Sequence, residues 1–193
     1  LNRGYLSSVM RYNAILADMN ELIGLSEVKE KLNVLLLSTL GRRMEVQKLG
    51  EIDLEKPNLN FVFEGNPGTG KTTVAGQMAK ILYEFGLIED IIPVEIDAAA
   101  LVNSGVGDTA KAVEQMFKDH SGRVIFIDEA EAILPARGSR RSSDVETTIV
   151  PTFLSEMDGF EENSTFIILA TNYLEQLDPA VIRPGRIDLQ IEI

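Results

Sequence analysis

The chain has 193 residues, of which 45% are hydrophobic and 25% are charged, and its formal net charge is −12. This length and composition fit one domain, or two at most. The acidic excess argues against a dedicated nucleic-acid-binding protein, because binding to phosphates requires a basic surface. The chain contains no cysteine, which excludes disulfide and thiol chemistry.

The sequence also carries information about location. No apolar run approaches the ~20 residues that are needed to span a bilayer. The N-terminus has neither a secretory signal nor an initiator methionine. We therefore expect a soluble, cytoplasmic protein, and we expect the chain to be a fragment or a processed product.

Residues 1–57 are predicted to form an N-terminal helical segment. Helical periodicity covers residues 5–18, and Ser26 is expected to cap a second helix from about residue 27 to residue 49. The sequence Lys-Pro-Asn at 56–58 ends this segment. We therefore divide the chain into residues 1–57 and a core of residues 58–193.

In the core, short apolar runs alternate with amphipathic segments, which is typical of βαβ units. Strands are expected at 60–64, 93–97, 123–128, 165–170 and 188–193, and helices at 71–85, 109–119, 144–157 and 179–182. The predicted fold class is therefore α/β, with a five-stranded parallel sheet between helices. The polar stretch 136–143 is expected to be a mobile loop.

The strongest chemical signal is the segment 65–72 (GNPGTGKT), which has the spacing G-x-x-x-x-G-K-[ST] between an apolar strand and a helix. Its glycines let the backbone wrap around phosphates, so that N–H groups bind anions at a helix N-terminus. Lys71 adds positive charge for the β- and γ-phosphates, and the Thr72 hydroxyl is expected to bind Mg²⁺. A chance glycine-rich turn is the alternative, and the complete match disfavours it. The residues expected to hold the nucleotide are Asn66, Pro67, Gly68, Thr69, Gly70, Lys71, Thr72 and Thr73.

A second signal follows the apolar run 124–127 (VIFI), where Asp128 and Glu129 end a strand expected to be buried on both faces. Ligands of open α/β sheets bind beyond the carboxyl ends of the strands. Asp128 is expected to hold the metal ion through water, and Glu129 to polarise the attacking water as general base. The two acids could also cap the next helix, and both roles are compatible.

Asn172 follows the buried strand expected at 165–170. It could orient the attacking water from the side opposite Glu129. Asparagine after a strand is more often only a turn former, so both interpretations stay open.

Arg183 and Arg186 flank a Pro-Gly turn, after a short helix that Asp178 is expected to cap. Each arginine could pair with a carboxylate of its own chain, as surface arginines usually do. Alternatively, each could reach the γ-phosphate in a neighbouring subunit as an arginine finger, where its guanidinium stabilises the transferred charge.

With these four elements in this order, the chain resembles the AAA+ ATPase family over roughly residues 20–193. Residues 67–72 resemble its Walker A motif, residues 127–129 its Walker B motif and Asn172 its sensor 1. Residues 171–186 are similar to the second region of homology that marks the AAA subgroup. Residues 153–159 also resemble the sequence of that subgroup. The resemblance implies binding of ATP and Mg²⁺, a ring that is commonly a hexamer, and remodelling of a macromolecule. It also implies that Ile23 and Gly24 lie on the adenine side.

Within the family, residues 21–29 and 63–75 resemble the group of red-type Rubisco activases and stage V sporulation protein K, and also type VII secretion ATPases. Two features depart from the family pattern. Gly105 stands where substrate-threading members carry a pore aromatic residue, which puts threading in doubt. The chain ends at Ile193, directly after the fifth expected strand, and so lacks the family's helical lid, either as a trimmed chain or as a minimal form.

Three functions remain open. The first is Mg²⁺-dependent ATP hydrolysis by a ring of like subunits that remodels a protein client. The second is an ATP-dependent assembly scaffold with little turnover, against which Glu129 argues because a binding module needs no base. The third is a DNA-directed AAA+ protein, which the net charge of −12 disfavours.

Overall fold

A computed structural model of the chain describes residues 60–84, 86–102, 106–138, 145–159 and 165–193. Five isolated residues of the N-terminal segment are also described, and all are helical: Ala17, Ser26, Lys29, Glu30 and Val34. Ser26 therefore lies within a helix, where we expected a cap. The division at residue 57 falls outside the described residues, as do Ile23, Gly24 and Gly105.

A five-stranded parallel sheet forms the centre of the fold, in the order β2-β3-β4-β1-β5. Strands β1, β3 and β4 are buried on both faces, as their unbroken apolar runs predict, whereas the edge strands β2 and β5 alternate in burial. All five strands lie within one residue of the predicted boundaries, which confirms the fold class. Their bounds are β1 Phe61–Glu64, β2 Val94–Asp97, β3 Val124–Asp128, β4 Phe166–Thr171 and β5 Leu189–Glu192.

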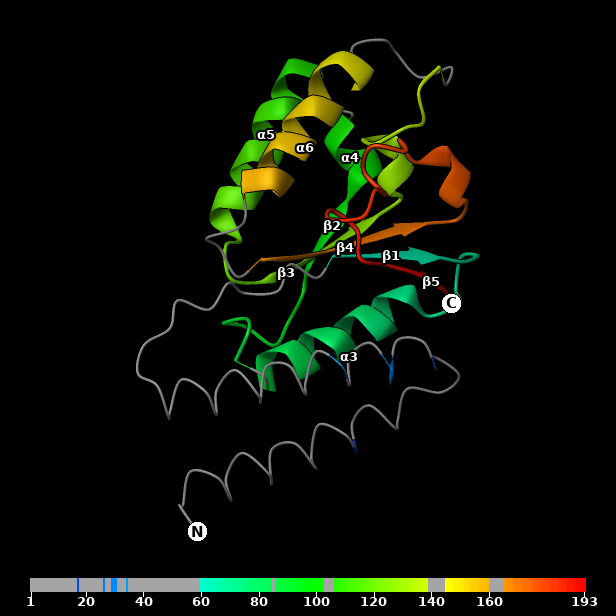
Figure 1. Ribbon diagram of the computed structural model, residues 1–193. Helices are drawn as coiled ribbons and strands as arrows, with labels where there is room; N and C mark the ends of the chain where they lie inside the picture. Colours follow the sequence, from blue (N-terminus) through cyan, green and yellow to red (C-terminus); the bar gives the residue numbers. More distant parts are fainter. Residues whose placement is uncertain are drawn as a thin grey trace.

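Helices cover both faces of the sheet (Figure 1). On one face lies α3 (Lys71–Glu84), which packs on Phe61 and Phe63 of β1. The opposite face is covered by α4 (Ala98–Val102), α5 (Val106–Asp119) and α6 (Val150–Asp158). None of the helices in the described part of the chain is long and apolar enough to cross a membrane.

The boundaries of two predicted helices need correction. Helix α5 begins at Val106, three residues before the expected start. The helix expected at 144–157 begins as a π-helical turn, η2 (Val145–Ile149), and continues as α6. Pro151 explains this change, because it has no N–H to donate to the preceding turn.

The helix predicted at 179–182 is wrong, because residues 179–186 form turns and bends. Asp178 makes the expected cap contact, since its Oδ1 accepts the N–H of Ala180 at 2.7 Å. The helix does not continue because Pro184 disfavours the helical conformation at Arg183. Gly185 then reverses the chain with a positive φ of 90°.

Asn60 ties together the beginnings of three strands. Its side chain Oδ1 accepts the N–H of Ile167 in β4 at 2.9 Å. Its backbone N–H donates to Asp188 Oδ2 at 3.1 Å, and its carbonyl accepts the N–H of Asp188 at 2.9 Å. Asn60 is 8% exposed, so these groups have little access to water as a substitute partner.

We expect the Asn60→Ala variant to lose about 1–3 kcal/mol of unfolding free energy, because the buried N–H of Ile167 loses its acceptor. Urea denaturation followed by circular dichroism measures this loss. Gln190→Ala is the control, because Gln190 is an exposed residue of the edge strand β5, and its effect is expected to stay within about 0.5 kcal/mol. Equal losses in the two variants would contradict the role of Asn60.

Candidate functional site

A cleft of about 320 Å³ opens beyond the carboxyl ends of the central strands. Its walls come from the loop after β1 and the first turn of α3, from the end of β3 and from the end of β4. Because β4 lies between β3 and β1, the sheet brings these three places together. The lining residues are Pro67, Gly68, Gly70, Lys71, Thr72, Thr73, Asp128, Glu129 and Asn172, and each of them was a candidate from the sequence.

The loop after β1 depends on glycine at three positions for two reasons. Gly68 and Gly70 have positive φ values of 82° and 99°, which other residues rarely adopt. At Gly65 the limit is space, because an added Cβ would lie 2.4 Å from the carbonyl oxygen of Ile193. Thr69 Oγ1 closes the loop by donating to the carbonyl of Asn66 at 3.0 Å, and neither of these two residues lines the cleft.

Lys71 places a buried positive charge at the base of the loop. Its Nζ donates to the carbonyls of Gly65 and Asn66 at 2.7 and 3.2 Å, and to Asn172 Oδ1 at 3.4 Å. The residue is 8% exposed, and none of the ion pairs among the described residues includes it. Burying an ammonium group without a counter-charge is costly. An anionic group of a ligand in the cleft would supply the counter-charge that the hydrogen-bond partners of Lys71 lack.

Asp128 and Glu129 follow one another at the end of β3, and both are exposed in the cleft. Asp128 Oδ1 accepts the backbone N–H of Glu129 at 3.0 Å. Glu129 has φ 51° and ψ 43°, and it is the only non-glycine residue with positive φ in the described ranges. Such a conformation costs about 1–3 kcal/mol, and residues that adopt it cluster at functional sites. The strained residue is thus the one predicted to be the general base.

The oxygen atoms on the cleft wall fit Mg²⁺. The Thr72 hydroxyl and the Asp128 carboxylate both line the cleft. Mg²⁺ binds through one or two protein carboxylates, and its other ligands are water and substrate phosphates. The described residues contain no group of three or more His, Cys, Asp or Glu that could hold a metal ion. Thr72 and Asp128, the two ligands predicted from the sequence, therefore stay a prediction that the lining of the cleft is compatible with.

The two arginines after the cleft residues have different environments, and neither lines the cleft. Arg186 is bound within its own chain: Nε and Nη2 donate to the two carboxylate oxygens of Asp158 at 2.7 and 2.6 Å, and Nη1 donates to the carbonyl of Ala180 at 2.9 Å. Arg183 is exposed. The sequence left two alternatives open for Arg186. In the structure Arg186 pairs with a carboxylate of its own chain, Asp158.

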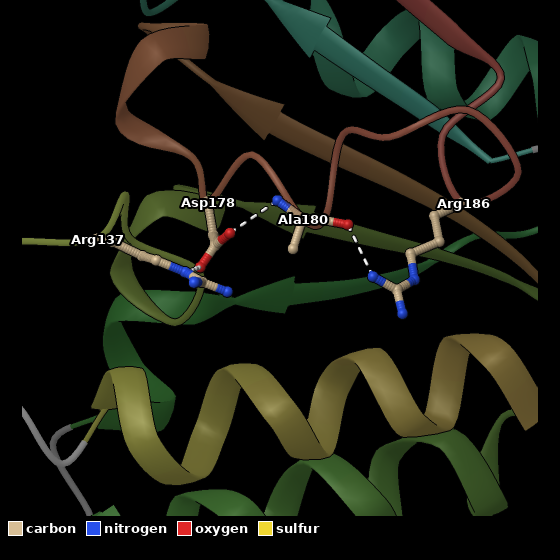
Figure 2. A network of polar contacts seen from close by, with 4 residues as sticks. All are labelled: Arg137, Asp178, Ala180 and Arg186. Carbon is tan, nitrogen blue, oxygen red and sulfur yellow. Dashed lines mark hydrogen bonds and ion pairs between the residues drawn. The ribbon is translucent and has the colours of Figure 1, made fainter.

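The turn that carries these arginines is also held at its beginning (Figure 2). Arg137 Nε lies 3.4 Å from Oδ2 of Asp178, whose side chain is buried and whose Oδ1 binds the N–H of Ala180. The carbonyl of Ala180 in turn accepts a hydrogen bond from Nη1 of Arg186 (Figure 2). Sequence analysis missed Arg137 and Asp158 as partners, because no local spacing rule joins residues 28 or 41 positions apart.

The Asp158–Arg186 pair shifts the pKa of both groups. The hydrogen bond from Arg186 lowers the pKa of Asp158 below its usual value of 3.8, although burial acts in the opposite direction. The same hydrogen bond raises the pKa of Arg186. Because the Asp158 side chain is 53% exposed, solvent screens the pair and limits its contribution to stability.

Comparison with known proteins adds to this geometry. The model of the family "ATPase family associated with various cellular activities (AAA)" matches residues 61–193. A protein of Bifidobacterium dentium named "AAA ATPase forming ring-shaped complexes" is 38% identical over 146 residues, which cover 72% of this chain and 28% of that protein. Proteins of the same name from Bifidobacterium longum and Bifidobacterium animalis subsp. lactis are 38% and 39% identical over 159 and 149 residues, covering 72% and 73% of this chain. The chain spans less than a third of the length of these relatives, 28–30%.

The lowered pKa of Asp158 predicts how pH affects stability. The contribution of the ion pair is fully present above the unfolded pKa near 3.8, and it is lost as the pH falls through the lower, folded value. At pH 7 we expect Asp158→Asn to lose about 0.5–1 kcal/mol, and the difference from wild type to shrink as the pH falls below 3.8 and to vanish once Asp158 is protonated in the folded state. Urea unfolding at a series of pH values measures it.

Asp119→Asn is the matched control, because Asp119 is an exposed carboxylate whose hydrogen-bond partner is Gln115, not arginine. A loss in Asp158→Asn that stays constant from pH 7 to the acid limit would contradict the ion-pair origin of the effect.

Proposed function

This chain belongs to the AAA family of ATPases, and on that basis we propose that it binds ATP with Mg²⁺ and hydrolyses the γ-phosphate bond. One observation carries the proposal: the glycine loop, two adjacent carboxylates and Asn172 line a single cleft. The buried ammonium of Lys71, which has only neutral partners among the described residues, supports an anionic substrate.

The residues around the loop would bind the triphosphate. Backbone N–H groups of the loop would donate hydrogen bonds to phosphate oxygens, and the Lys71 ammonium would offset their negative charge. The Thr72 hydroxyl would hold Mg²⁺ directly, and Asp128 would hold it through water. When bound, Mg²⁺ withdraws negative charge from the phosphate oxygens and so favours attack at phosphorus.

Glu129 and Asn172 would act on the attacking water. The Glu129 carboxylate accepts a proton from this water as general base. The Asn172 amide, which belongs to the neighbouring strand end, orients the water by hydrogen bonding. The strained backbone of Glu129 supports a functional role, because such conformations cluster at active sites.

We further propose that like subunits assemble into a ring, with a hexamer as the expected size, and that Arg183 acts in the site of a neighbour. The name of the curated relatives, which says that they form ring-shaped complexes, supports assembly. Arg183 is exposed and lies outside its own cleft. Arg186 remains a prediction for the same role, but it would first have to release Asp158.

The proposed work of the ring is to remodel a protein client. This step rests on the resemblance to AAA proteins and on the net charge of −12, which argues against nucleic acid. The alternative is an assembly scaffold that binds ATP with little turnover. Turnover that depends on Glu129 distinguishes the two.

We expect Glu129→Gln to lower kcat by ~100-fold or more, because glutamine cannot accept the proton, and to leave ATP affinity within about threefold. Steady-state phosphate release and binding of a fluorescent ATP analogue measure the two effects. Lys71→Ala provides the contrast, because we expect it to lose ATP binding. Hydrolysis at the wild-type rate in Glu129→Gln would remove Glu129 as the base, and absence of turnover in the wild type would favour the scaffold.

Hydrolysis is also expected to depend on the assembly of subunits. The rate per subunit should rise with protein concentration in the wild type and fall by ~1,000-fold in Arg183→Ala, because the arginine finger would come from a neighbour. Lys118→Ala, which removes an exposed positive charge at the end of α5, is the control and should match the wild type. A rate independent of both concentration and Arg183 would contradict action across a subunit interface.

A further inference from the structure

Glu64 is the last residue of β1 and directly precedes the glycine loop. Its carboxylate is partly buried, and Oε1 accepts the backbone N–H of Leu174, which follows the neighbouring strand β4, at 3.0 Å. Leu174 begins a short 3-10 helix, η4 (Leu174–Gln176), and the preceding residue, Tyr173, makes no side-chain cap hydrogen bond. The first N–H of this turn is therefore capped from another strand, 110 residues away in sequence.

This contact and a second one attach the segment around Asn172 to the end of β1. On one side of Asn172, the carbonyl of Thr171 accepts the N–H of Gly65 at 3.1 Å. On the other side, Leu174 is bound to Glu64. Asn172 thus lies between two hydrogen bonds, one to Gly65 and one to Glu64, at the junction of β1 and the glycine loop.

The turn between these attachments is tightened by its own hydrogen bonds. The Thr171 hydroxyl accepts the N–H of Tyr173 at 3.2 Å and donates to the Tyr173 carbonyl at 3.1 Å. The Asn172 side chain lies in the cleft, with Oδ1 3.4 Å from Lys71 Nζ. A shift of the turn would therefore move the amide relative to Lys71.

We propose that Glu64 is a positioning residue for hydrolysis, because its hydrogen bond to Leu174 fixes the turn that holds Asn172 in the cleft. The inference rests on the proposed ATP hydrolysis, and it gives Glu64 no contact with substrate. A carboxylate acceptor makes this a charge-assisted hydrogen bond, which is stronger than a neutral one. Glutamine keeps an oxygen acceptor in the side chain, so it should largely preserve the turn.

The test uses the full-length protein and changes each end of the hydrogen bond. Glu64→Ala removes the acceptor, Glu64→Gln keeps an oxygen, and Leu174→Pro removes the donor. Proline suits position 174, because Tyr173 has φ −144° and ψ 110°, the extended conformation favoured before proline. If Leu174→Pro fails to fold, the two Glu64 variants still decide the question.

We expect Glu64→Ala and Leu174→Pro to lower kcat by about tenfold, the rate equivalent of one charge-assisted hydrogen bond. ATP affinity should stay within about threefold, because the loop, Lys71 and Thr72 are unchanged. Glu64→Gln should stay within about threefold of wild type in kcat, and the double variant should lose no more than either single one. Glu64→Ala should also change kcat little in a protein that already carries Asn172→Ala.

A second measurement detects the turn without turnover. Hydrogen exchange of residues 172–176 in the nucleotide-free protein should be faster in Glu64→Ala than in the wild type and in Glu64→Gln. Unchanged exchange overturns the inference. A Glu64→Ala variant that hydrolyses ATP like the wild type, or that loses as much activity with Asn172→Ala as without it, overturns the inference and leaves the proposed function intact. Absence of turnover in the wild type overturns both, and exchange then reports a structural contact only.

Discussion

The burial of β1, β3 and β4 on both faces is the constraint on which the rest of the structure depends. The strands are parallel, so each connection between neighbours must cross over to the same starting edge, and the helices in these crossovers cover both faces of the sheet. All loops that follow these strands therefore meet at one edge of the sheet. Lys71, Glu129 and Asn172 are far apart in sequence, yet they line one cleft because β4 lies between β3 and β1.

The sequence could predict those parts of the structure that depend on a local pattern of residues, such as a run of apolar residues or a motif with fixed spacing. The alternation of short, mostly apolar segments with amphipathic ones located all five strands to within a residue, and the loop motif with the acidic strand end located the cleft. Helix α4 was missed, although Asp97, whose Oδ1 accepts the N–H of Ala100 at 3.1 Å, precedes a run of alanines that favours helix. The pairs Glu64–Leu174 and Asp158–Arg186 could not be predicted, because their partners meet only after the sheet has formed.

Arg183 and Arg186 have the same side chain but different environments, because only Arg186 is bound to a carboxylate of the described part of its own chain. The turn between Asp178 and Arg186 is held at one end by the buried Asp178 carboxylate and at the other by the bidentate contact to Asp158. Arg183 lies between these two anchors and is exposed. Anchoring of the turn reduces the backbone freedom that would otherwise be lost when Arg183 binds a partner. A turn that is fixed within its own chain is thus suited to present an exposed cation outward.

The left-handed backbone of Glu129 has a consequence for anyone who engineers this domain. Glycine or asparagine tolerates that conformation better than glutamate does. A screen that ranks variants by melting temperature alone would therefore favour replacement of this residue and report success. The gain would come at the carboxylate on which the proposed chemistry depends, as in other trade-offs between stability and activity. At this position, thermal stability and turnover must be selected together.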